Sequence, residues 1–99
     1  MTQPPSITFV VPALNEAAHI RNTLQTMMQA VEQSRVSDYE IIFVDDGSTD
    51  DTGKLMDEAA RHNSHIRVLH NERNLGFGEA YKRGAAQAQI GRASCRERV

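Results

Sequence analysis

The chain has 99 residues, of which 39% are hydrophobic, and this length and composition suit one small globular domain or part of a larger one. It holds no apolar run of the roughly 18 residues that a membrane-spanning helix needs, and its first residues, MTQPP, lack the basic and apolar regions of a signal peptide, so we expect the cytoplasm. The formal net charge of -2 argues against the basic surface that is typical of a nucleic-acid-binding protein.

The first predicted element is a short apolar strand over residues 7–11, which Pro12 ends because proline cannot donate to a strand ladder. A helix should follow, since apolar residues recur at helical spacing: Ala17, Ile20, Leu24, Met27, Met28 and Val31. We expect Asn15 to cap this helix and Glu16 to lie in its first turn, where a negative charge is favourable.

The second predicted strand, residues 39–44, stops abruptly at two carboxylates, Asp45 and Asp46. Ligands of α/β sheets bind at the carboxyl ends of strands, so we expect these paired acids to do more than pack. Asp50 or Asp51 can cap a second helix. The inner face of that helix should hold Leu55, Met56, Ala59 and Ala60.

A third strand is predicted over residues 65–69, and a third helix over about residues 77–88. The core face of this helix should hold Phe77, Ala80, Tyr81, Gly84, Ala85 and Ala88, and the small residues among them predict a close approach to the sheet. The histidines have no metal-ligand spacing, so we expect surface positions for His19, His62, His65 and His70.

The order βαβαβα predicts an α/β fold with a three-layer, Rossmann-like parallel sheet and right-handed crossovers. The loops at residues 13–15, 45–51 and 71–76 should therefore gather at one edge of the sheet. We expect Val44 to be buried and Asp46 to lie at the rim. An edge of this sheet should stay open where a fourth strand would pair.

Residues 90–99 (IGRASCRERV) show neither a helical nor a strand period and hold the only cysteine, Cys95. In all ten positions they resemble the translation of a common short-read sequencing adapter. We therefore treat them as a non-native addition and leave them out of the fold prediction. The alternative is a genuine basic tail. Without Cys95 the chain offers no thiol chemistry, which fits a reducing compartment.

Three motifs taken together resemble the family 2 glycosyltransferases of the GT-A fold: VPALNE at 11–16, VDDGSTD at 44–50 and RNLGFGEAYKRGAAQA at 73–88. Within this family, the residues of these motifs are most similar to those of the dolichyl- or polyprenyl-phosphate sugar transferases. The resemblance implies the N-terminal half of a GT-A fold, with residues 1–89 as the nucleotide-sugar-binding part of a truncated domain. It also implies an inverting transferase of the hexosyltransferase type, which uses a UDP- or GDP-linked sugar.

By the same resemblance, the first motif would line the nucleotide pocket with Pro12, Leu14 and Glu16. Val44 and Asp46 would flank the base and ribose, where a carboxylate accepts a hydrogen bond from a base N–H or a ribose hydroxyl. Asp45 would steady the loop. Gly76 and Gly78 would let the third loop lie close to the donor.

The resemblance also implies what this chain lacks. The Asp-x-Asp motif that holds Mg²⁺ or Mn²⁺ in the family, the general base and the acceptor site would all follow residue 89. We therefore expect no catalytic residue and no metal ligand here, and no transferase activity of the isolated chain. A lipid-phosphate acceptor would place the parent protein at the cytoplasmic face of a membrane, through its missing C-terminal region.

The alternative to an enzyme is a non-catalytic nucleotide-binding or receiver-like α/β regulatory module, which also gathers acids at strand ends. In a receiver the acid pair should follow the first strand, which here ends in Pro-Ala-Leu-Asn. A dinucleotide oxidoreductase is disfavoured as well, because Gly76-x-Gly78 follows the third strand and the third glycine of the fingerprint would fall at Tyr81.

Overall fold

The computed structural model of the chain describes residues 6–34, 36, 38–89 and 93–96. Four parallel strands form one sheet in the order β3-β2-β1-β4. The strands are β1 (Ser6–Ala13), β2 (Asp38–Asp46), β3 (Ile66–Asn71) and β4 (Ala93–Arg96). The helices are α1 (Ala17–Gln33), α2 (Thr52–His62) and α3 (Phe77–Ala85). The predicted βαβαβα order and the parallel sheet are confirmed.

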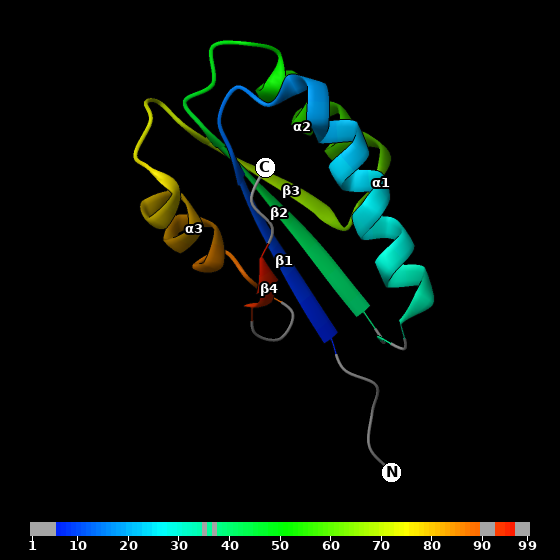
Figure 1. Ribbon diagram of the computed structural model, residues 1–99. Helices are drawn as coiled ribbons and strands as arrows, with labels where there is room; N and C mark the ends of the chain where they lie inside the picture. The colour runs from blue at the N-terminus through cyan, green and yellow to red at the C-terminus, as the bar shows by residue number, and fades with distance from the viewer. Residues whose placement is uncertain (1–5, 35, 37, 90–92, 97–99) are drawn as a thin grey trace.

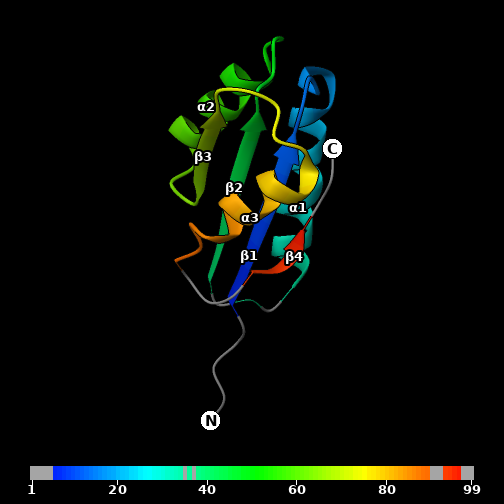
Figure 2. The same cartoon turned by 90° about the vertical axis from the view of Figure 1, so that its left-hand side faces the viewer.

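The helices lie in two layers, with α1 and α2 on one face of the sheet and α3 on the other (Figures 1 and 2). Alternation along the strands separates two cores, because neighbouring residues point to opposite faces. The core between the sheet and the helices α1 and α2 consists of Phe9, Val11, Ala13, Ile20, Met27, Ile41, Phe43, Met56 and Ile66. The core between the sheet and α3 consists of Val10, Ile42, Val44 and Ala80.

The small residues of α3 bring it close to the sheet, as predicted. A Cβ added to Gly84 would lie 2.6 Å from a methyl of Val10 and 2.8 Å from a methyl of Val44. The two tyrosines pack at the margins of the cores: Tyr39 against the first and Tyr81 against the second. Both are half-buried.

The strands are longer than predicted, and this changes what the motif residues do. Pro12 does not end β1 but pairs with Val44 of β2. Proline is tolerated there because β4 pairs only with residues 8–10 of β1, so β2 is the one strand beside Pro12 among the described residues. Asp45 and Asp46 belong to β2 and pair with His70 and Asn71 of β3.

The predicted open edge is not found at β1, since β4 pairs there in parallel, with Thr8 opposite Ala93. Residues 93–96, which the fold prediction leaves out, thus form an edge strand. The backbone groups of an edge strand accept any extended neighbour, whatever its side chains, so a segment without a strand pattern can still pair.

A buried charge ties the chain after α3 to the amino-terminal end of the sheet. Glu40 of β2 is 5% exposed. Its carboxylate accepts hydrogen bonds from the Thr8 hydroxyl at 2.8 Å, from the Arg67 guanidinium at 3.1 Å and from the backbone N–H of Gln89 at 2.8 Å. Arg67 also donates to the carbonyl oxygen of Gln87. This network satisfies a charge that would otherwise be costly to bury.

Candidate functional site

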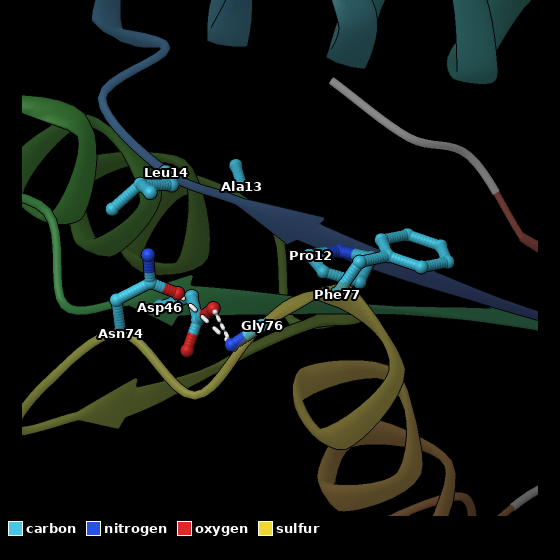
Figure 3. A pocket seen from close by; sticks show the side chains of 7 residues that line it. All are labelled: Pro12, Ala13, Leu14, Asp46, Asn74, Gly76 and Phe77. Carbon is cyan, nitrogen blue, oxygen red and sulfur yellow. Dashed lines mark hydrogen bonds between the residues drawn. The ribbon is translucent and has the colours of Figure 1, made fainter.

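The loops after β1, β2 and β3 meet at the carboxyl edge of the sheet, at the top of Figure 1. A cavity of about 240 Å³ opens between them and the start of α3. Its lining residues are Pro12, Ala13, Leu14, Asp46, Asn74, Gly76 and Phe77. In Figure 3, Leu14 and Asn74 lie at one end of this cavity, and Pro12 and Phe77 lie at the other. We refer to it as the edge pocket.

The structure brings four of the six predicted donor-binding residues together at the edge pocket: Pro12, Leu14, Asp46 and Gly76. Val44 does not line it, because its side chain is fully buried beneath α3. Glu16 does not line it either. Its backbone N–H donates to the Thr52 hydroxyl at 2.8 Å, which places Glu16 where the first loop meets α2.

Asp46 is buried, with 4% of its surface exposed, although it lies at the end of β2. The expected rim position therefore holds for the place of Asp46 at the strand end but not for its side chain, which is buried. Oδ1 accepts hydrogen bonds from the Asn71 amide and from the N–H of Leu75, both at 2.9 Å, and Oδ2 accepts from the N–H of Gly76 at 3.0 Å. A carboxylate has about four acceptor sites, so one remains for a ligand, on Oδ2.

Asp45 points away from the edge pocket and steadies its own loop, as predicted. Its Oδ1 accepts the N–H of Ser48 and its Oδ2 faces the Nδ1 of His70, both at 2.9 Å. The Nε2 of His70 lies 2.9 Å from Asp57 on α2. The hydrogen bond with Asp45, followed by that with Asp57, raises the pKa of His70 above its ordinary value of 6.5.

Asn15 does not cap α1, contrary to the prediction. Glu16 occupies the N-cap position, without a side-chain cap. Asn15 has a φ of 54°, which asparagine tolerates better than most residues. Its side-chain oxygen accepts hydrogen bonds from the N–H of Thr49 at 2.8 Å and of Asp50 at 3.3 Å, so it binds the second loop instead. Sequence reasoning could not find this, because the partners lie more than 30 residues apart.

Asp50 joins the same two loops. Its Oδ1 accepts the N–H of Thr52 at 2.9 Å, and its Oδ2 accepts the N–H of Ala17 at 3.3 Å, at the start of α1. The side-chain hydrogen bond from Thr52 is the main cause that lowers the pKa of Asp50. Of the two acids predicted to cap α2, Asp50 binds the N–H of its first residue. Asp51 occupies the N-cap position but makes no side-chain cap bond.

Two glycines shape the loops around the edge pocket. Gly47 has a φ of 81°, and a Cβ there would lie 2.5 Å from the backbone of Arg73, so the second loop rests against the third. Gly76 has a φ of 92°, which favours glycine at this position immediately before α3. At Gly78 a Cβ would meet nothing within 4 Å, so the described residues give no steric reason for a glycine there.

Three lining residues were not predicted: Ala13, Asn74 and Phe77. The side-chain oxygen of Asn74 accepts the N–H of Gly76 at 2.9 Å, which fixes its amide at the pocket (Figure 3). Its position two residues before a glycine was the available signal, since asparagine side chains bind the backbone two residues on. Asn71 was missed as well. It is 6% exposed, and among the described residues its Oδ1 has no hydrogen-bond partner.

The acids at this edge do not form a metal site. In the part of the chain that the structure describes, no group of three or more His, Cys, Asp or Glu side chains is placed to hold a metal ion. Asp45 and Asp46 mainly accept hydrogen bonds from N–H groups, which leaves too few free oxygens for Mg²⁺ or Mn²⁺.

Within the described ranges, no helix has the length and apolar character to cross a membrane.

Comparison with known proteins gives a consistent result. The family model described as glycosyl transferase family 2 matches residues 8–90. A dolichyl-phosphate beta-glucosyltransferase of Trichomonas vaginalis is 34% identical over 87 residues, which cover 84% of this chain and 27% of that protein. A protein of the same description from Dictyostelium discoideum is 36% identical over 84 residues, which cover 79% of this chain and 26% of that protein.

A solved structure is similar over most of the chain. The mannosyltransferase PcManGT from Pyrobaculum calidifontis, in complex with GDP-Man and Mn2+, superposes with a TM-score of 0.74 and 26% sequence identity. The match covers 89% of this chain and 26% of that one. The chain therefore spans about a quarter of the length of these relatives.

Proposed function

Because the chain belongs to glycosyl transferase family 2, we propose that its edge pocket binds the nucleoside part of a nucleotide diphosphate sugar, the donor of an inverting glycosyltransferase. The observation that carries this proposal is the composition of the edge pocket. Apolar side chains from β1 and α3 face a buried carboxylate that keeps one acceptor site. An apolar wall suits a base or a ribose, and the carboxylate suits one N–H or O–H group.

The size of the edge pocket supports the same assignment. Sites for complete small ligands span about 300–1,000 Å³. The edge pocket holds about 240 Å³, so it suits a nucleoside better than a whole sugar nucleotide. The diphosphate and the sugar would extend beyond it, towards the part of the parent protein that carries the metal site. We expect weak binding to this chain, with a Kd of about 0.1–1 mM.

The acceptor and the metal belong to the parent protein. Two relatives are described as dolichyl-phosphate glucosyltransferases, and the solved relative contains GDP-Man and Mn2+. We infer a UDP- or GDP-linked sugar, a polyprenyl or dolichyl phosphate as acceptor, and Mg²⁺ or Mn²⁺ for the parent at the cytoplasmic face of a membrane. We also infer that residues 90–99 are non-native and that this chain transfers no sugar. Transfer by the purified chain to dolichyl phosphate would contradict the last inference.

A calorimetric titration of the purified chain tests the donor proposal. UDP-glucose, GDP-mannose and NAD are titrated separately, and one of the two sugar nucleotides should bind more tightly than NAD. Leu14, which is 37% exposed in the pocket wall, is then changed to Ala. We expect affinity to fall about five-fold from the lost apolar contact, whereas Ala18→Glu on the exposed face of α1 should leave it unchanged. Equal binding of NAD, or no effect of Leu14→Ala, would refute the proposal.

A further inference from the structure

His70, at the end of β3, faces a carboxylate with each of its two ring nitrogens. Nδ1 lies 2.9 Å from Asp45, and Nε2 lies 2.9 Å from Asp57. Each carboxylate oxygen that faces the ring is an acceptor for an N–H donor. A neutral imidazole donates from only one nitrogen, whereas an imidazolium donates from both. The geometry therefore favours the protonated ring, which can donate to both carboxylates at once.

A chain of hydrogen bonds leads from this ring to the edge pocket. Asp45, whose side chain is 11% exposed, accepts the N–H of Ser48 at 2.9 Å. The Ser48 hydroxyl in turn accepts the N–H of Asn15 at 3.0 Å. Asn15 directly follows Leu14, the exposed apolar side chain in the wall of the pocket. His70 is thus connected to that wall through the loop after β2.

The start of α2 is shaped around the contact between His70 and Asp45. A Cβ added to Gly53 would lie 2.4 Å from Oδ2 of Asp45 and 3.2 Å from the Cε1 of His70. Glycine forms helices less readily than alanine does. Its presence here leaves room for the ion pair, which is an independent indication that this contact is built into the fold.

The other charged groups around His70 do not replace these two partners. Glu72 and Arg73 of the third loop and Arg83 of α3 line the same polar cavity as His70. None of the three forms an ion pair or a hydrogen bond with the ring among the described residues. The hydrogen bonds to Asp45 and Asp57 raise the pKa of His70, so the ring gives up its proton above the usual pH.

We propose that His70 is a positioning residue of the edge pocket, whose protonated ring holds Asp45 and the second loop in place, so that affinity for the nucleotide ligand falls when the ring loses its proton. This inference rests on the proposed function of the pocket. The loss of one hydrogen bond of ordinary strength predicts a decrease in affinity of about two- to ten-fold.

NMR of the whole chain between about pH 6 and 9 tests the proposal. Three quantities are followed: the titration of the His70 ring, the protection of the Ser48 and Asn15 amides from hydrogen exchange relative to an unstructured chain at the same pH, and the Kd of the sugar nucleotide. All three should change with one midpoint. Exchange that follows His70 while no nucleotide binds would refute the function of the pocket but support the loop linkage. If the protection of these amides and the affinity for the sugar nucleotide both stay constant while His70 titrates, the proposal is overturned.

Variants separate positioning from a general structural role. His70→Gln should bind the sugar nucleotide weakly at every pH, and its affinity should no longer change with pH. His62→Gln, on the exposed face of α2, should keep both the affinity and the midpoint of its pH dependence. If His70→Gln does not fold, Asp57→Asn serves instead. It removes the charge beside Nε2 only, so the common midpoint should move to lower pH. A midpoint unmoved in Asp57→Asn would contradict the proposal.

Discussion

Removing the carboxylate of Asp46 is the sharpest test of how the edge pocket is built. The change Asp46→Ala deletes the acceptor of three N–H donors, from Asn71, Leu75 and Gly76. The N–H of Gly76 keeps a second acceptor, the side-chain oxygen of Asn74 at 2.9 Å. Among the described residues, two donors therefore lose their side-chain acceptor.

The expected effect follows from those two donors. A buried donor left without a partner costs about 1–3 kcal/mol, so Asp46→Ala should lower the free energy of unfolding by about 4 kcal/mol. A domain of this size has a total stability of about 5–15 kcal/mol. The variant should therefore be marginal or unfolded at room temperature. Asp46→Asn keeps one oxygen and should cost less, about 1–2 kcal/mol.

Urea denaturation followed by circular dichroism measures these differences from the midpoints at constant slope. Asp51→Ala is the matched control, because its side chain is 75% exposed and its ion pair with Lys54 spans 3.9 Å. That variant should stay within about 0.5 kcal/mol of the parent chain. If Asp46→Ala stayed within the same range, the hydrogen bonds to the third loop would contribute little, and the reasoning would be refuted.

Three further changes test other parts of the structure. Gly53→Ala should lower Tm by about 5 °C in a thermal melt, because its Cβ would collide with Asp45; an unchanged or higher Tm would contradict this. Gly84→Ala should lower the free energy of unfolding, measured in urea, by about 1–2 kcal/mol, because the added methyl group overpacks Val10 although alanine has the better helix propensity. A more stable variant would exclude that close contact. Hydrogen bonding by Thr52 lowers the pKa of Asp50. The ionised Asp50 therefore stabilises the folded chain above pH ~3.9, and this stabilisation is lost as the pH falls through the lowered pKa. Asp50→Asn should flatten the acid limb of stability against pH, and an unchanged limb would count against this.

The fold was predictable from the sequence because it depends on local periodicity. The buried residues Ile20 and Met27 recur at helical spacing, and Phe9 and Val11 alternate with residues of the opposite core. The family resemblance came from the same stretches. The position of Pro12 within β1 is not predictable in this way, because the sequence does not show how far β4 extends along β1.

The contacts within the edge pocket were less predictable, because they join loops that are distant in the chain. Leu14 and Gly76 were expected at the pocket and do line it. The roles of Asn15 and Asp46 were missed, since each binds the backbone of a loop about 30 residues away. A sequence pattern shows that a polar residue follows a strand, but it does not show which neighbouring backbone that residue will bind.

The network around Glu40 has a consequence for how the chain continues. The backbone N–H of Gln89 binds this carboxylate, which lies on the central strand β2. The contact uses a main-chain donor, so it holds for almost any side chain at that position. The entry point of the next strand beside β1 is therefore set by upstream residues. The chain therefore reaches the edge of β1 at the same place whatever side chains follow, which agrees with the pairing of β4 there although residues 93–96 have no strand pattern.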